Sequence, residues 1–147
     1  MSAPARPDGG LAAAFAEMPL TLKGVTSFFA VFGVGSVLLP LLPGIEHRVG
    51  GARLASAALW QSGFGVYALA MGLWLSLCAF GLLRRAGWAC WGAIGACLPF
   101  LLAEPLLAET PRVALRAAIA VAWGAAAWAY LFRTRGATAY FRRPAPR

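Results

Sequence analysis

Hydrophobic residues gather in four long stretches of this chain, separated by short polar segments. The stretches cover residues 24–42, 54–83, 88–107 and 113–132, and they contain few charged side chains. A helix needs about 20 apolar residues to cross a hydrocarbon core that is roughly 30 Å thick. The pattern therefore predicts helices that span a membrane rather than the helices of a soluble domain.

The second stretch is too long for one upright span. Its uncharged residues, 54–83, would extend about 45 Å as a straight helix. We therefore expect the span at about 63–83, preceded by an interfacial segment around Trp60. The expected fold is an all-α membrane protein, an antiparallel bundle of four transmembrane helices at about 24–42, 63–83, 88–107 and 113–132.

The polar segments divide the chain into three parts. Residues 1–20 begin with a Pro- and Gly-rich stretch and are expected to be a disordered or interfacial segment. Residues 21–133 form the transmembrane domain, and residues 134–147 form a basic tail with aromatic residues. The first hydrophobic core is longer than the roughly 7–15 residues of a signal peptide and lacks a small-x-small cleavage site, so we expect a retained span.

The positions of lysine and arginine predict the orientation of the bundle, because positively charged loops stay in the cytoplasm. With the N-terminus inside, nine basic residues fall on the cytoplasmic side: Arg6, Lys23, Arg84, Arg85, Arg133, Arg135, Arg142, Arg143 and Arg147. Four fall on the other side: Arg48, Arg53, Arg112 and Arg116. Both termini are therefore expected to be cytoplasmic.

The composition supports a membrane protein and excludes several other classes. Of the 147 residues, 61% are hydrophobic and only 12% are charged, against roughly 25% charged in soluble domains. So few charges could not cover the surface of a soluble enzyme, a secreted disulfide domain or a disordered tail. The basic residues that give the net charge of +8 flank the hydrophobic spans. We therefore assign the excess of positive charge to membrane orientation and expect no nucleic-acid partner.

Small residues at helical spacing predict how the helices pack, because close approach drives helix association inside a bilayer. The candidate packing residues are Ala68, Gly72 and Ser76 in the second span, Gly92 and Ala96 in the third, and Gly124 in the fourth. The first span offers Ala30, Gly33 and Ser36. The fourth span carries small residues on almost all sides, with Ala117, Val121, Ala125 and Ala129 on one line. It is the candidate for contact with another chain.

The sequence carries no recognisable catalytic motif. Its three cysteines, Cys78, Cys90 and Cys97, lie within spans and form no C-x-x-C pair. The one histidine, His47, cannot supply the two axial ligands of a bundle haem. We therefore expect no catalytic residue, no cofactor and no metal site, and a protein that is not an enzyme.

The outer ends of the third and fourth spans carry the one candidate polar site, formed by Glu104, Glu109, Arg112 and Arg116. Ionisable residues at membrane depth are candidates for function, although a Glu104–Arg116 pair could equally clasp a helical hairpin. The outer polar residues that could join such a site are Glu46, His47, Gln61 and Tyr67.

Two short motifs mark the cytoplasmic side. A basic turn followed by aromatic residues reads LLRRAGWACW at Leu82–Trp91, and the tail contains ATAYFRR at Ala137–Arg143. In this layout the chain resembles uncharacterised bacterial inner-membrane proteins of four spans. The resemblance implies a location in the bacterial inner membrane, and it implies no particular activity. Basic residues near a membrane surface attract anionic lipids, so lipid contact is the expected role of the tail.

These observations lead to two main functional hypotheses, besides an enzyme that acts on a lipid or quinone and needs protein partners to complete its site. The first is a non-enzymatic inner-membrane protein that acts by association, as a homo-oligomer or as an accessory subunit of a membrane complex. Its expected partners are membrane lipids and either itself or another membrane protein. The alternative is a protein that binds or conducts a small molecule or ion through the outer Glu/Arg pair.

Overall fold

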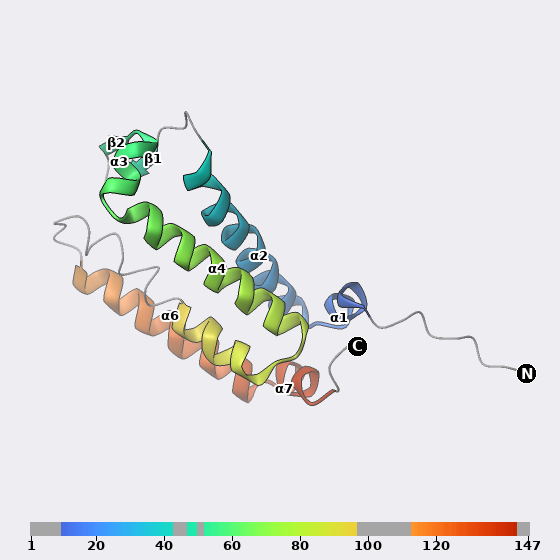
Figure 1. Cartoon of the computed structure of the whole chain (residues 1–147). Helices are drawn as coiled ribbons and strands as arrows, with labels where there is room; N and C mark the ends of the chain where they lie inside the picture. The colour runs from blue at the N-terminus through green and yellow to red at the C-terminus, as the bar shows by residue number, and fades with distance from the viewer. Residues whose placement is uncertain (1–9, 43–46, 50–51, 97–112, 144–147) are drawn as a thin grey trace, which may run out of the picture.

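The computed structural model describes residues 10–42, 47–49, 52–96 and 113–143, and these are mainly helical (Figure 1). In chain order the elements are α1 (Leu11–Ala16), α2 (Leu20–Leu38), the 3-10 helix η1 (Leu39–Leu41), β1 (His47–Val49), β2 (Ala52–Leu54), α3 (Ser56–Gln61), α4 (Phe64–Leu83), α6 (Val113–Arg133) and α7 (Arg135–Phe141). Residues 87–96 are also helical.

Two of the described helices are long and apolar enough to cross a membrane. They are α2 together with η1, a segment of 22 residues at Leu20–Leu41, and the 20 residues of α4. Helix α6 contributes a shorter apolar stretch, Ala117–Arg133. The expected helical fold is thus confirmed in its coarser form. The third predicted span is described only as far as residue 96, and its remainder lies outside the described residues.

The long uncharged run at 54–83 divides into two helices at Gly63. This residue has a φ of +78°, a left-handed conformation that glycine adopts without steric cost, and it separates α3 from α4. The Trp60 indole N–H donates to the Pro40 carbonyl oxygen at 3.1 Å, which joins α3 to η1. The Trp60 ring also covers Gly65, where an added Cβ would lie 2.9 Å from it.

A pair of short strands departs from the purely helical expectation. β1 and β2 pair antiparallel with His47 opposite Leu54, Arg48 opposite Arg53 and Val49 opposite Ala52. The strands lie beside α3 at one end of the bundle (Figure 1). Pairing satisfies backbone N–H and C=O groups that a loop would leave to solvent, which accounts for local strand structure between two helices.

The core of the described chain lies between α2 and α4, whose contact is the most extensive between any two labelled elements. Leu22 and Phe29 of α2 and Leu75, Cys78 and Leu82 of α4 are buried there. These positions recur at helical spacing, so each helix buries one stripe and leaves the rest of its apolar surface exposed.

Residues 87–96 fold back along α4 after the basic turn. An added Cβ at Gly81 would lie 2.7 Å from the Ala89 Cβ, so these two small residues let the helices approach closely at the turn. The Trp74 indole N–H donates to the Gly92 carbonyl oxygen at 3.3 Å further along. The Trp91 and Phe132 rings, 4.9 Å apart between centroids, connect this segment to α6.

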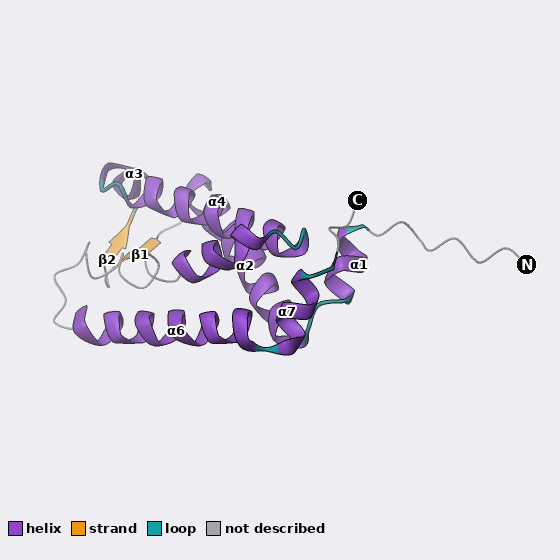
Figure 2. Cartoon of the chain, turned by 90° about the horizontal axis from the view of Figure 1, so that it is seen from below, coloured by secondary structure: helices purple, strands orange, loops and turns teal. Residues whose placement is uncertain are grey.

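The short helices α1 and α7 lie at the same end of the bundle, opposite the end that holds β1, β2 and α3 (Figures 1 and 2). The beginning of α2, the end of α4 and the end of α6 meet there. Both views place α6 as a separate layer alongside α2 and α4. Segments from the two ends of the described chain are therefore brought together.

Candidate functional site

The outer polar site expected from the sequence is not placed by the structure. Glu104, Glu109 and Arg112 lie outside the described residues. Arg116 belongs to the first turns of α6, but its side chain also lies outside what is described. Of the residues that could join them, Gln61 is exposed on α3 and Tyr67 is half-buried on α4. Glu46 lies outside the described residues, and His47 begins β1.

The candidate packing residues occupy different environments. Gly72 is buried against α2, and Ala68 and Ser76 are half-buried along the same helix. Gly92 is buried against α4, where an added Cβ would lie 3.0 Å from the Cys78 Sγ, and Ala96 is buried as well. Gly124 is packed loosely, because the nearest atom to an added Cβ there would lie 4.0 Å away. The internal contacts of the described chain therefore use the small residues of α4 and residues 87–96 more than Gly124.

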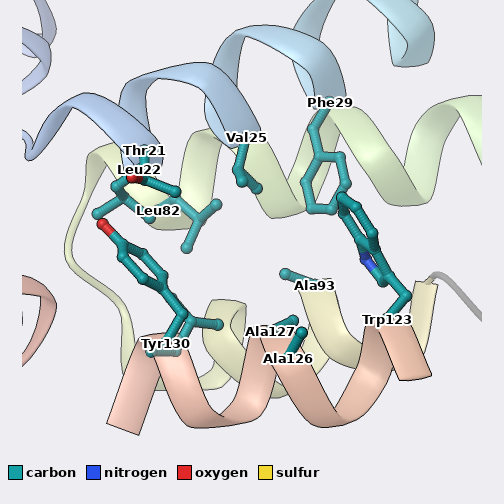
Figure 3. A pocket seen from close by; sticks show the side chains of 11 residues that line it. Thr21, Leu22, Val25, Phe29, Leu82, Ala93, Trp123, Ala126, Ala127 and Tyr130 are labelled. Carbon is teal, nitrogen blue, oxygen red and sulfur yellow. The ribbon is translucent and has the colours of Figure 1, made fainter. Parts of the chain in front are cut away.

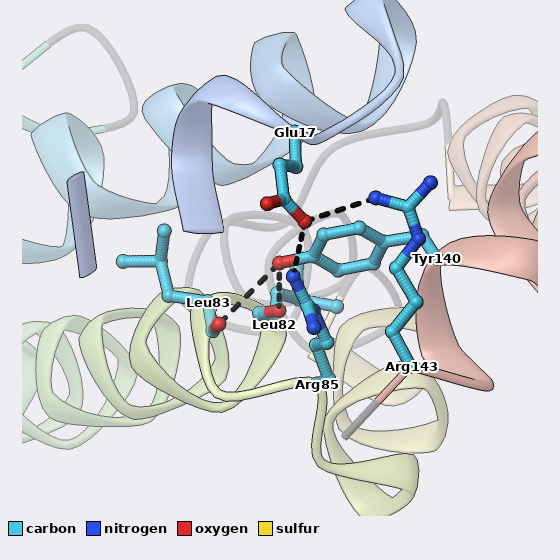
Figure 4. Close-up of polar contacts among 6 residues, drawn as sticks. All are labelled: Glu17, Leu82, Leu83, Arg85, Tyr140 and Arg143. Atoms are coloured by element: carbon cyan, nitrogen blue, oxygen red, sulfur yellow. Dashed lines mark hydrogen bonds and ion pairs between the residues drawn. The ribbon is translucent and has the colours of Figure 1, made fainter. Parts of the chain in front are cut away.

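A polar cluster at the end that holds α1 and α7 joins four side chains from distant parts of the sequence (Figure 4). We call Glu17, Arg85, Tyr140 and Arg143 the clasp. One Glu17 oxygen, Oε2, accepts hydrogen bonds from Arg85 at 2.7 Å and from Arg143 at 2.9 Å. The Arg85 guanidinium carbon also lies 4.9 Å from the centre of the Tyr140 ring, in cation–π geometry.

Tyr140 is the buried centre of the clasp. Its side chain comes from α7, and its hydroxyl donates to the carbonyl oxygens of Leu82 at 3.2 Å and Leu83 at 3.3 Å. The last carbonyls of a helix have no partner within that helix, so this hydroxyl caps the end of α4. Tyr140 belongs to the basic tail, and its phenol packs against protein, whereas lipid contact of the tail stays a prediction.

Arg85 has an unusual backbone conformation, with a φ of +57°. The Ala86 N–H donates to the Gly81 carbonyl and the Arg85 N–H donates to the Leu82 carbonyl, which together form a Schellman motif at the end of α4. Glycine usually occupies the left-handed position of this motif because a side chain there costs roughly 1–2 kcal/mol. The buried Arg85 side chain thus makes its contacts from a strained backbone.

The electrostatics of the clasp follow from its geometry. The hydrogen bond from Arg143 lowers the pKa of the Glu17 carboxyl below its usual 4.5, partial desolvation opposes this, and the positive charges of Arg85 and Arg143 add to the lowering. Burial raises the pKa of the Tyr140 phenol. Glu17 is therefore ionised and Tyr140 is a neutral donor at neutral pH.

The clasp joins the two motifs that the sequence analysis singled out. Arg85 belongs to the segment Leu82–Trp91, and Tyr140 and Arg143 belong to Ala137–Arg143. The motifs were interpreted only through charge and resemblance, and their mutual contact was not predicted. Glu17 lies in the N-terminal segment, for which the sequence predicted no contact with either motif.

An apolar cavity of about 210 Å³ lies beside the core, between α2, α4 and α6 (Figure 3). It is lined by Thr21, Leu22, Val25, Phe29, Leu82, Ala93, Trp123, Ala126, Ala127, Tyr130 and Leu131. The walls offer almost no polar surface, so the cavity suits hydrocarbon rather than a polar substrate. The Trp123 ring borders this space.

Neither the clasp nor the cavity has the composition of a metal or redox site. Among the described residues, no three His, Cys, Asp or Glu side chains gather to hold a metal ion. Cys78 and Cys90 are buried and belong to no disulfide. The clasp can make ion pairs and hydrogen bonds, and the cavity can shelter an apolar chain.

Comparison with family models, curated proteins and solved structures finds no match to this chain.

Proposed function

We propose that this chain is a non-enzymatic, multi-pass protein of the bacterial inner membrane, with both termini in the cytoplasm, that acts by association through the outer face of α6. Its partner is a second copy of the chain or another membrane protein. The observation that carries the proposal is a row of exposed alanines along α6.

The membrane setting is supported by how little of the long apolar helices is buried. Only 22% of the apolar window of α2 and 33% of that of α4 are buried inside the chain. The core helix of a soluble protein would be mostly covered by its neighbours. Leu73, Leu77 and Val66 of α4 are instead exposed, as are Val31 and Val34 of α2, and a bilayer is the solvent in which such surfaces are stable.

The alanine row consists of Ala118, Ala122, Ala125 and Ala129, all exposed. Their spacing of four, three and four residues places them on one face of the helix. Small side chains let two helix backbones approach closely, which is what drives association within a bilayer. The small residues of α4 already serve contacts inside the chain, whereas this row faces away from it.

A mass measurement tests the association directly. The native mass of the wild-type assembly, gently extracted from its own membrane and identified subunit by subunit, should exceed the mass of one chain. The double variant Ala122→Leu/Ala125→Leu should shift the mass toward the single chain, because the larger side chains separate the backbones. A wild-type protein that runs as a monomer would overturn the proposal.

The control is Ala70→Leu, the same substitution at an exposed alanine of α4. It places the same leucine side chain at an exposed position away from the row, so the assembly should keep its mass. Gly72 is not a suitable test position, because it is buried against α2 and its replacement would disturb the fold of the single chain. Equal loss of assembly in Ala70→Leu and in the double variant would count against the α6 face.

A further inference from the structure

The apolar cavity has a defined size and a clear direction. Its 210 Å³ exceeds the cavity of about 150 Å³ that accommodates benzene in a protein core, so by proportion it holds on the order of eight chain carbons. Phe29 and Trp123 border one end of it, and Leu22, Leu82 and the Tyr130 hydroxyl lie at the other (Figure 3). A linear hydrocarbon lying along α6 would fill the space between them.

The only hydroxyls of the lining side chains mark one end of the cavity. The lining contains Thr21 and Tyr130, and Figure 3 shows both hydroxyl oxygens at the end nearest Leu22 and Leu82. Beyond this end Pro19, which precedes α2, lies against α7, where an added Cβ on Gly136 would be 3.6 Å from the Pro19 Cγ. The clasp lies further in the same direction. The cavity thus runs from a hydroxylated end near the clasp to an aromatic end deeper along the helices.

Positive charge gathers at the clasp end of the molecule. Lys23, Arg84, Arg85, Arg133, Arg135, Arg142 and Arg143 all belong to elements or turns that meet there. Glu17 is the one acidic residue among the described part of the chain. A membrane surface facing this end would concentrate anionic headgroups, at about 1 kcal/mol for each basic residue close to it.

We propose that the cavity holds one acyl chain of an anionic phospholipid, with the ester end of the chain near Thr21 and Tyr130 and its methyl end toward Phe29 and Trp123. The headgroup remains at the basic surface, in the leaflet that faces α1 and α7. This inference rests on the membrane location in the proposed function, and it does not depend on association through α6.

Native mass spectrometry of the full chain tests the site. The protein is stripped of lipid in detergent and titrated with phosphatidylglycerol or with phosphatidylcholine of identical chains. We expect one phosphatidylglycerol retained per chain, with at least tenfold weaker retention of phosphatidylcholine. Ala127→Phe places a ring in the cavity and should reduce retention at least tenfold. Val121→Phe, at an exposed position of α6 that does not line the cavity, should leave it unchanged.

A second measurement needs no variant that fills the cavity. Phosphatidylglycerol with brominated acyl chains is added in detergent at one lipid per protein molecule. It should quench tryptophan fluorescence until the site is saturated. Trp123→Phe should remove most of this quenching, whereas Trp91→Phe, at a side chain that is 60% exposed, should not. Trp123 lines the cavity and Trp91 does not.

The outcomes separate this proposal from the previous one. Retention that is unaffected by Ala127→Phe, together with quenching that survives Trp123→Phe, would overturn the acyl-chain site. Equal retention of the two lipids would overturn the choice of an anionic headgroup. A monomeric protein that retains phosphatidylglycerol would support the site while overturning association through α6.

Discussion

Gly33 of α2 and Gly72 of α4 face each other with no space between their backbones for a side chain. A Cβ added to Gly33 would lie 2.9 Å from the Gly72 carbonyl oxygen, and one added to Gly72 would lie 2.7 Å from the Gly33 carbonyl oxygen. Both distances are shorter than a carbon–oxygen van der Waals contact. This close approach of the two long helices therefore depends on both residues being glycine.

Replacing either glycine should separate the helices. Gly33→Ala and Gly72→Ala would each press a methyl group against backbone that cannot rotate away, and overpacking of this kind costs about 1–3 kcal/mol. We expect both variants to lower the midpoint of thermal unfolding in detergent. The double variant should cost less than the sum of the two, because one separation relieves both clashes.

Gly35→Ala is the matched control on the same helix. An added Cβ at Gly35 would meet nothing within 4 Å. Alanine has a higher helix propensity than glycine by about 1 kcal/mol, so this variant should be unchanged or more stable. If Gly33→Ala and Gly35→Ala have the same effect, the close contact does not limit stability.

Arg85 provides a test of backbone strain in the clasp. Arg85→Ala loses the bond to Glu17 and the contact with Tyr140 while keeping a Cβ at a positive φ. Arg85→Gly loses the same contacts but relieves the strain, so it should be more stable than Arg85→Ala by about 1 kcal/mol. Thermal unfolding midpoints in detergent measure the difference.

The neighbouring Arg84 should show no such advantage. Its φ is −78°, where alanine is unstrained. Arg84→Gly should therefore be no more stable than Arg84→Ala. An equal glycine advantage at both positions would show that flexibility of the whole turn, and not the conformation of Arg85, sets the result.

The hydrophobic pattern predicted the long helices because the ability of a helix to span a membrane depends on its length and composition. The uncharged run at 54–83 exceeds one span, and it divides at Gly63 into α3 and α4 as its length requires. The strand pair at 47–49 and 52–54 could not be predicted from length, since three-residue strands carry almost no periodicity.

The clasp could not be predicted from the sequence for a different reason. Its basic residues lie far from Glu17 in the sequence: Arg85 is 68 residues away and Arg143 is 126 residues away. A charge pattern indicates which side of a membrane a residue occupies, but it does not indicate which distant charge it meets. The cavity is similarly hidden, because Val25, Ala127 and Trp123 read as ordinary helix-packing residues. The outer pair Glu104–Arg116 stays a prediction.

Removing the Tyr140 hydroxyl should loosen α7. Tyr140→Phe keeps the ring over Arg85 but loses the donor to the carbonyls of Leu82 and Leu83. A hydrogen bond of this kind contributes about 1 kcal/mol, which corresponds to roughly fivefold in the opening equilibrium of α7. Hydrogen exchange of the α7 amides should therefore quicken about fivefold.

Tyr140→Leu also removes the ring, so its exchange should be faster than that of Tyr140→Phe. The α2 amides serve as the internal control and should exchange unchanged in both variants. Identical exchange of α7 in Tyr140→Phe and in the wild type would contradict a capping role for the hydroxyl.

The ionisation of Glu17 should make the clasp sensitive to acid. The pKa of this carboxyl is lowered in the folded chain, chiefly by its hydrogen bond from Arg143. A group with a depressed folded pKa stabilises the fold above its unfolded pKa, and this contribution is lost as the pH falls through the folded value. The clasp should therefore be intact at neutral pH and should open at a pH below 4.5.

Spin labels at Ala12→Cys and Ala139→Cys measure the opening, because these exposed positions lie on α1 and α7. The distance distribution should be narrow at pH 7 and should broaden in acid. Glu17→Gln, which cannot ionise, should be broad at both pH values. Since Glu17 and Arg143 are about half exposed, high salt should weaken the wild-type clasp as well. If the distribution stays narrow both for the wild type in acid and for Glu17→Gln, Tyr140 holds α7 without the ion pairs.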